Sequence, residues 1–261
     1  MRYLFLSLLL AALVAPGAHA TLDEAQDAYD RGDFVTAGEL AREHDGIQAK
    51  TLAAQAYLAE AGYVANGGDA RKWLTESVAL AKEALAKDPD HVEAILYRVI
   101  AMGYEGRVLG NWSAHNEGLG REAKALITHA MELEPENPWV HMVYGGWHAE
   151  IVDGAGAFMG SLLYGAKTKT AIKSSKKAVT LAPDEPVFRV EYARSLLRLS
   201  FSKYTEEVTE QLTLALAIKP TNAFEEIILD HGRQLLAALE TKDKKTIKRV
   251  FVTLDAFRDP Q

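Results

Sequence analysis

Four apolar helical runs in this chain end in the same way, with an alanine, four further residues and a proline. These endings are Ala84–Pro89, Ala130–Pro135, Ala178–Pro183 and Ala215–Pro220. Proline cannot continue a helix, because it lacks an amide hydrogen and its ring clashes with the preceding turn. An ending that recurs in this way is typical of stacked helical hairpins. The sequence therefore predicts an all-α fold, an α-solenoid in which each hairpin packs against its neighbours.

The remainder of the chain agrees with a helical array. Alanine, leucine, glutamate and lysine dominate, and apolar residues recur at helical spacing. A turn at Asn66–Asp69 divides the second hairpin, and we expect Asp69 to be the N-cap of the following helix. The prolines and glycine turns together predict about six hairpins, at residues 21–45, 46–88, 90–134, 138–182, 186–219 and 222–257.

Two hairpins are longer than the others. The first three of the recurring prolines are 46 and 48 residues apart, whereas the fourth follows after 37. The additional residues fall in two glycine-rich inserts, Arg107–Gly120 and Asp153–Gly165. Inserts within regular repeats often carry function. The Gly154–Gly160 stretch lacks the spacing of phosphate and dinucleotide loops, so we expect a tight turn there. Four apolar residues should then fold back onto the array: Phe158, Met159, Leu162 and Leu163.

The first hairpin resembles a tetratricopeptide repeat (TPR). The residues that carry this resemblance are Tyr29, Gly32-Asp33-Phe34, Ala37 and Ala41, together with the alanine–proline endings of the later hairpins. Small residues permit close helix packing, an aromatic ring fills the hairpin, and proline sets the exit of the chain. The resemblance extends over nearly all of residues 22–257 and implies a right-handed superhelix of TPR-like hairpins.

The central part has a more particular likeness. Ala130–Pro135, Val143–Glu150, the glycine-rich insert and Ala178–Pro183 resemble the layout of regulator-of-microtubule-dynamics-type repeat proteins and their bacterial relatives. A second resemblance is to periplasmic TPR proteins associated with tripartite substrate-binding transporters. A microtubule role is not expected of an exported protein.

Residues 1–20 have the pattern of a secretory signal peptide. Arg2 precedes the apolar run Leu4–Val14, and Ala18-His19-Ala20 fits a small-x-small cleavage site. We expect residues 1–20 to be removed and residues 21–261 to form a single exported, periplasmic domain. The alternative is an uncleaved anchor. No later segment has the about 18 uncharged residues that a membrane-spanning helix needs, so no stable membrane anchor is expected after cleavage.

Composition and motifs argue against several classes of function. The net charge is −7 and no long basic run occurs, so nucleic acid is not expected as a partner. The chain contains no cysteine and no Gly-x-Ser-x-Gly motif. His141 and His148 are seven residues apart, about 10 Å along a helix, too far to share one metal ion without other ligands. We therefore expect no catalytic residue, metal or cofactor, and no enzymatic activity.

Aromatic residues provide the candidate binding site. Tyrosines recur on the first helices of the hairpins, which line the concave face in solenoids of this kind. Tyrosine and tryptophan offer large contact areas with a polar tip. The candidate binding residues are Tyr97, Tyr104, Tyr144, Trp147, His148 and Tyr192. The alternative is that these side chains fill space between hairpins.

Two functions remain open at this point. The first is a non-catalytic scaffold or adaptor that binds a protein or peptide partner through the concave face. The second is a small-molecule-binding accessory protein of a transport system, with a pocket around Tyr144, Trp147 and the Gly154–Gly160 stretch. An enclosed cavity beside Trp147 would favour the small molecule, and an open groove would favour the scaffold.

Overall fold

The computed structural model describes residues 21–257, apart from the side chains of residues 111 and 112. The predicted signal peptide lies outside the described residues. Within residues 21–257 there are thirteen α-helices and one π-helix, and no strand. The helices are α1 Leu22–Asp30, α2 Phe34–Arg42, α3 Ile47–Ala59, η1 Glu60–Val64, α4 Gly67–Lys87, α5 Val92–Leu109, α6 Asn111–Asn116, α7 Leu119–Leu133, α8 Pro138–Tyr164, α9 Thr168–Leu181, α10 Pro186–Leu199, α11 Thr205–Leu216, α12 Ala223–Glu240 and α13 Lys244–Thr253.

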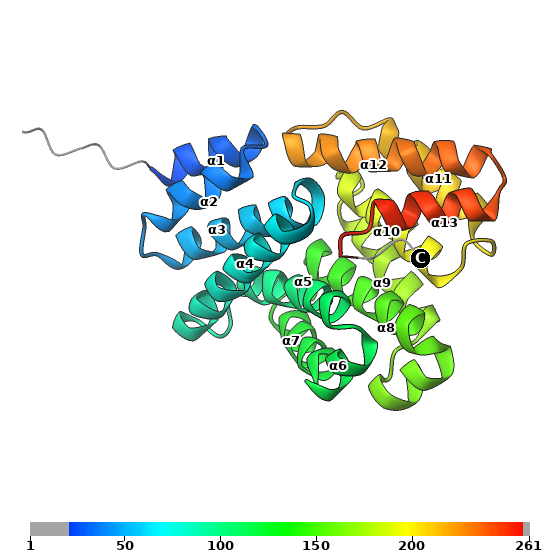
Figure 1. Ribbon diagram of the computed structural model, residues 1–261, viewed down its shortest axis with the longest axis horizontal. Coiled ribbons are helices and arrows are strands. Elements are labelled where there is room, and N and C mark those ends of the chain that lie inside the picture. The colour runs from blue at the N-terminus through cyan, green and yellow to red at the C-terminus, as the bar shows by residue number, and fades with distance from the viewer. Residues whose placement is uncertain (1–20, 258–261) are drawn as a thin grey trace, which may run out of the picture.

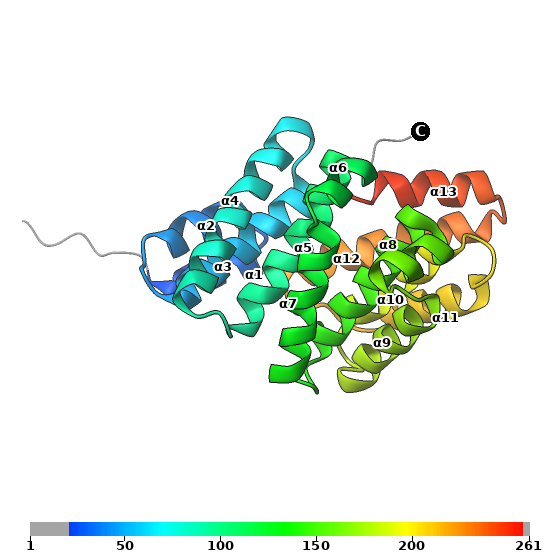
Figure 2. The same ribbon diagram turned by 90° about the horizontal axis from the view of Figure 1, so that it is seen from below.

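These helices pair in chain order into six hairpins, which confirms the prediction of an all-α solenoid. The pairs are α1 with α2, α3 with α4, α5 with α7, α8 with α9, α10 with α11, and α12 with α13. Figure 2 shows the first two hairpins at one end of the molecule, α11 and α13 at the other, and α5 and α7 between them. None of the described helices combines the length and hydrophobicity of a membrane span.

The repeated endings have the same structural cause in each hairpin. The alanines of all four are fully buried, because each lies where the second helix of a hairpin packs against its neighbours. At the first three, the alanine carbonyl accepts a hydrogen bond from the amide four residues later, which closes the helix before the proline. Pro138 and Pro186 then begin α8 and α10, where a missing amide hydrogen costs nothing. Asp69 is not an N-cap, because α4 already begins at Gly67 and Asn66 precedes it.

The two inserts are helical rather than loops. In the first, α5 continues to Leu109, and the short helix α6 lies between Gly110 and Gly118, both of which have positive φ. In the second, α8 continues to Tyr164 with a kink at Gly156, where φ is 76° and ψ is 158°. The prediction of a tight turn at Gly154–Gly160 is therefore wrong. The helix breaks only at Gly156, where the backbone conformation requires the freedom of glycine.

The apolar residues beyond the kink do not fold back onto the array, so this prediction is also wrong. Phe158 is 78% exposed and Leu162 is 68% exposed, and Met159 and Leu163 are exposed as well. The kink at Gly156 redirects the last two turns of α8, which lie at the lower edge of Figure 1.

The array curves until its two ends touch. Helix α1 contacts α12 (Figure 1). Phe224 of α12 packs against Tyr29 and Phe34 of the first hairpin. The ring centroids of Phe224 lie 6.3 Å from Tyr29 and 6.4 Å from Phe34. The turn at Gly32 has a φ of 88°, and a Cβ there would lie 3.0 Å from the Ala223 Cβ. The array thus curves around an inner side, the concave face, which carries the site described next.

Candidate binding site

Two arginines on α10 point into the concave face. Arg194 and Arg198 are four residues apart, so they lie on the same side of the helix. Both are buried. A buried guanidinium is stable only when it is paired and hydrogen-bonded. The partners of these two side chains therefore define the site.

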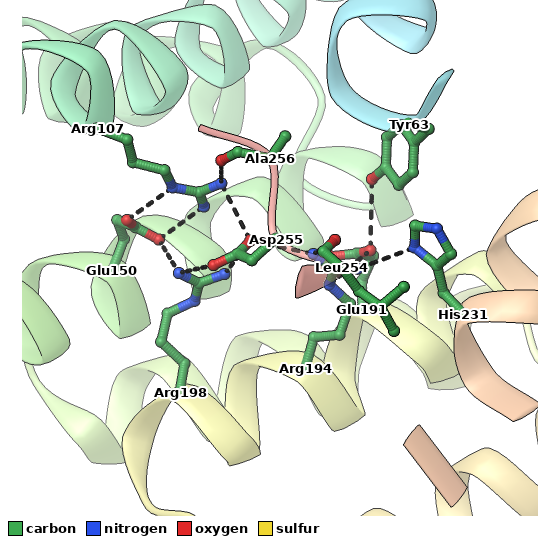
Figure 3. A network of polar contacts seen from close by, with 10 residues as sticks. All are labelled: Tyr63, Arg107, Glu150, Glu191, Arg194, Arg198, His231, Leu254, Asp255 and Ala256. Atoms are coloured by element: carbon green, nitrogen blue, oxygen red, sulfur yellow. Dashed lines mark hydrogen bonds and ion pairs between the residues drawn. The ribbon is translucent and has the colours of Figure 1, made fainter. Parts of the chain in front are cut away.

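The central partner is Asp255, from the segment that follows α13 (Figure 3). The side chain of Asp255 is only 1% exposed, and its carboxylate lies between the two arginines. Arg194 Nη2 donates to Asp255 Oδ1 at 3.1 Å, and Arg198 Nη2 donates to the same oxygen at 3.0 Å. Arg198 Nη1 also lies 3.0 Å from Asp255 Oδ2. The carboxylate of Asp255 thus joins the sixth hairpin to the fifth.

A third arginine comes from the third hairpin. Arg107 lies on the part of α5 that the first insert lengthens, and its guanidinium binds Glu150 of α8 in a bidentate manner, at 3.0 Å and 2.9 Å. Arg107 Nη1 lies 3.1 Å from Asp255 Oδ1 and donates to the Ala256 carbonyl at 3.1 Å. Glu150 Oε2 also lies 2.6 Å from Arg198 Nη1. Three guanidinium groups therefore meet on one carboxylate.

Further polar groups surround Arg194. Its Nε lies 3.5 Å from Glu191 Oε1, and the same oxygen accepts a hydrogen bond from the Tyr63 hydroxyl of η1 at 3.5 Å. Arg194 Nη1 donates to His231 Nδ1 of α12 at 3.3 Å. We call the whole set the inner-face network: Tyr63, Arg107, Glu150, Glu191, Arg194, Arg198, His231 and Asp255.

The network holds its groups in defined charge states. Burial on its own would raise the pKa of Asp255, but Arg198, Arg107 and Arg194 outweigh it and hold that pKa far below its usual range. The pKa of Glu150 is lowered in the same way, since Arg107 and Arg198 outweigh burial. Burial, and then the charge of Arg194, lowers the pKa of His231 to about 4. At neutral pH Asp255 and Glu150 are therefore ionised and His231 is neutral.

Tyr104 is the candidate binding residue that touches this network. Its ring lies beside Arg107, with the guanidinium carbon 5.2 Å from the ring centroid. The ring of Phe257 lies 5.3 Å from that of Tyr104. Burial raises the pKa of Tyr104, so the hydroxyl remains protonated. Tyr104 is thus an aromatic candidate residue that lies against the charged groups of the concave face.

Tyr144, Trp147 and His148 lie together on α8, away from the network. Trp147 is buried, and its Nε1 donates to the Gly120 carbonyl at 3.1 Å. His148 is also buried, and its Nδ1 accepts a hydrogen bond from the Lys167 amide at 3.1 Å. The rings of Tyr144 and Trp147 pack on the imidazole at 4.6 Å and 4.8 Å. These contacts tie α8 to the starts of α7 and α9.

The remaining two candidates pack against other helices of the array. Tyr97 is partly buried and packs with the cluster around Tyr57 and Leu80. Tyr192 is buried, and its hydroxyl donates to Glu207 of α11 at 2.6 Å. The structure therefore does not gather the six candidate residues into one surface. A binding role for them stays a prediction.

The sequence contains one overlooked signal for the inner-face network. Helix α10 carries Glu191, Arg194 and Arg198 at intervals of three and four residues. Charges on the buried face of a helix need partners, and they mark a site more specifically than aromatic residues do. Nothing in the sequence around Asp255 indicates that it would be the partner.

No known family matches this sequence, and no curated protein is similar enough to count as a relative. Among solved structures, the chain is similar to TTC0263, a thermophilic TPR protein of Thermus thermophilus, with a TM-score of 0.57 and 17% sequence identity. The match covers 81% of this chain and 96% of that one. The fold is TPR-like. At this level of sequence identity the similarity concerns the fold alone.

Proposed function

We propose that this protein is an exported, periplasmic and non-catalytic scaffold or adaptor that binds another protein through its concave face. The observation that carries the proposal is a TPR-like array whose inner face holds charged side chains from four hairpins. Charges that meet at the centre of a curved array offer directional contacts to a protein segment. Export rests on the pattern of residues 1–20.

The chemistry of the described residues supports binding rather than catalysis. The arginines of the inner-face network hold the carboxyl groups of Asp255 and Glu150 ionised, so neither is a free acid near neutral pH. Among residues 21–257, no group of three or more histidine, cysteine, aspartate or glutamate side chains is placed to hold a metal ion.

The small-molecule alternative gains no support from the surroundings of Trp147. That side chain is hydrogen-bonded and packed among Val92, Ile127 and their neighbours. A depression of about 460 Å³ lies nearby on the outer side, between α7 and the end of α8. Its walls combine the polar side chains of Arg121, Lys124 and Glu132 with those of Leu163 and Tyr164, and it is open to solvent rather than an enclosed cavity.

Site-specific photo-crosslinking in the native envelope tests the scaffold proposal. The photoreactive residue replaces Val64, which follows Tyr63 of the network and is 44% exposed. The matched control is Leu214 on α11, a second helix of a hairpin, which is 42% exposed. We expect one defined protein to be captured from position 64 and not from position 214. Equal capture from both positions, or capture from neither, would contradict a partner on the concave face.

A further inference from the structure

The segment that follows α13 crosses the concave face and is held there residue by residue. The Leu254 carbonyl accepts a hydrogen bond from Arg194 at 3.2 Å, and the Ala256 carbonyl accepts one from Arg107 at 3.1 Å. Between them, the Asp255 carboxylate contacts all three arginines of the network. The ring of Phe257 packs on Tyr104. Residues 254–257, which we call the strap, are therefore held on the concave face, and Figure 3 shows Leu254, Asp255 and Ala256 among the arginines.

The positive charges of the three arginines in the network match the negative charge of Asp255 in the strap. Without Asp255, three guanidinium groups would share the carboxylates of Glu150 and Glu191. A buried ion that loses its partner is strongly unfavourable, because it has given up its hydration. The concave face therefore requires one more acidic group. In this structure the chain supplies that group itself.

The backbone of the strap is strained where it ends. Phe257 has a φ of 60°, in the left-handed region that bulky residues rarely adopt. Such a conformation persists only where surrounding contacts impose it. The contact with Tyr104 is one of these. A four-residue segment under strain, outside any helix, is suited to be released and replaced by a competing ligand.

We propose that the strap is an intramolecular ligand of the concave face, and that the partner binds by replacing it with an acidic segment of the same kind. In the partner's segment, as in the strap, an aspartate follows an apolar residue and precedes an aromatic residue by two positions. This inference rests on the proposed scaffold function and specifies the chemistry of its partner. The strap sets the affinity, because the partner must displace it.

A peptide supplied in trans tests this competition. The probe is a fluorescent peptide with the sequence of residues 252–257, Val-Thr-Leu-Asp-Ala-Phe, and its binding to the full chain is measured by fluorescence anisotropy. Asp255→Asn removes the competing charge, and Phe257→Ala removes the aromatic anchor but keeps the charge. We expect both variants to bind the peptide at least tenfold more tightly than the wild type does. A peptide with asparagine in place of aspartate should bind at least tenfold more weakly.

Two controls keep the result interpretable. Lys248→Ala alters an exposed residue of α13 and should leave the affinity at the wild-type value. Circular dichroism shows whether each variant is folded. If Asp255→Asn does not fold, the test is made with Phe257→Ala, which retains all the charges. Equal affinity of wild type and Phe257→Ala for the peptide would overturn the proposal. Equal binding of the aspartate and asparagine peptides would overturn it as well.

The envelope crosslink separates this inference from the scaffold proposal. Capture from position 64 should rise at least severalfold in the Phe257→Ala background. A partner that is captured equally with and without this substitution would leave the scaffold in place and overturn the strap. Tighter peptide binding by the variants, with no partner captured from the envelope, would support the strap as a ligand and contradict the scaffold.

Discussion

His148 and His231 are neutral because the protein buries them beside positive charges. Burial is the larger cause for both, followed by Lys124 and Lys167 for His148, and by Arg194 for His231. The pKa of each is lowered from 6.5 to about 4. The negative charge of Asp230 raises the pKa of His231, but by less than burial and Arg194 lower it. The folded protein therefore keeps both rings uncharged at a pH where an unfolded chain would protonate them.

This difference makes stability depend on pH. As the pH falls from about 6.5 to about 4, the unfolded state takes up a proton at each histidine and the folded state does not, so the free energy of unfolding decreases. His148→Asn keeps an acceptor for the Lys167 amide but cannot be protonated. We expect it to flatten the pH dependence by up to about 1.4 kcal/mol per pH unit.

Urea unfolding at several pH values between 4 and 7.5 measures the effect. The comparison is between the slopes of wild type and variant, so a constant loss of stability from the substitution does not interfere. Parallel curves would show that His148 is protonated equally in the folded and unfolded states, contrary to its buried position.

At the scale of elements, adjacent glycines of α8 have different roles. A Cβ on Gly145 would lie 2.4 Å from Ser175 Oγ and 3.0 Å from the backbone of α9, whereas a Cβ on Gly146 would have nothing within 4 Å. Gly145→Ala should therefore destabilise the protein by about 1–3 kcal/mol, because two helix backbones must separate. Gly146→Ala should stabilise it by about 0.5–1 kcal/mol through the higher helix propensity of alanine.

Chemical unfolding of the two single variants tests this contrast. Both variants replace glycine by alanine in the same helix. The change in helix propensity is therefore the same for both, and only the packing differs. A similar change in stability for both would mean that α8 and α9 do not approach each other as closely as the structure shows.

The repeated alanines offer a second test of the packing between elements. Ala178 is fully buried where α9 meets α10, and Ala178→Phe should overpack this contact at a cost of about 1–3 kcal/mol. Thr180→Phe adds the same ring two residues later at an exposed position and should change stability by less than about 0.5 kcal/mol. Thermal unfolding distinguishes them. An unchanged melting temperature for Ala178→Phe would contradict the register of the hairpins.

The hairpins can be predicted from the sequence because their signals are local. Proline endings, glycine turns and helical periodicity act within one or two helices, and the six predicted ranges agree with the six helix pairs. The inserts are harder to predict because glycine often ends a helix, whereas α8 passes through Gly154 and breaks only at Gly156. The network escapes prediction because its members come from four α-helices, η1 and the segment after α13, and no local pattern joins Arg107 to Asp255.

At the scale of the whole molecule, closure of the array is the least local feature. The contact between α1 and α12 joins residues about 190 positions apart, and the apolar periodicity of neither helix says which surface it will meet. Closure also shapes the site, because Phe224 lies 5.2 Å from the ring of Tyr63, which reaches Glu191. The first hairpin is therefore connected to the charged inner face through two aromatic rings.

Phe224→Ala should loosen this closure without unfolding the array. Its partly buried ring packs on Tyr29, Phe34 and Tyr63, so truncation should cost about 2 kcal/mol. Hydrogen exchange measured by mass spectrometry should show faster exchange in α1 and α2, while α8 to α11 remain protected. Phe158→Ala removes the same ring from an exposed position and is the matched control. Faster exchange throughout the variant would mean that the solenoid unfolds as one unit, and unchanged exchange in α1 would mean that its ends do not hold each other.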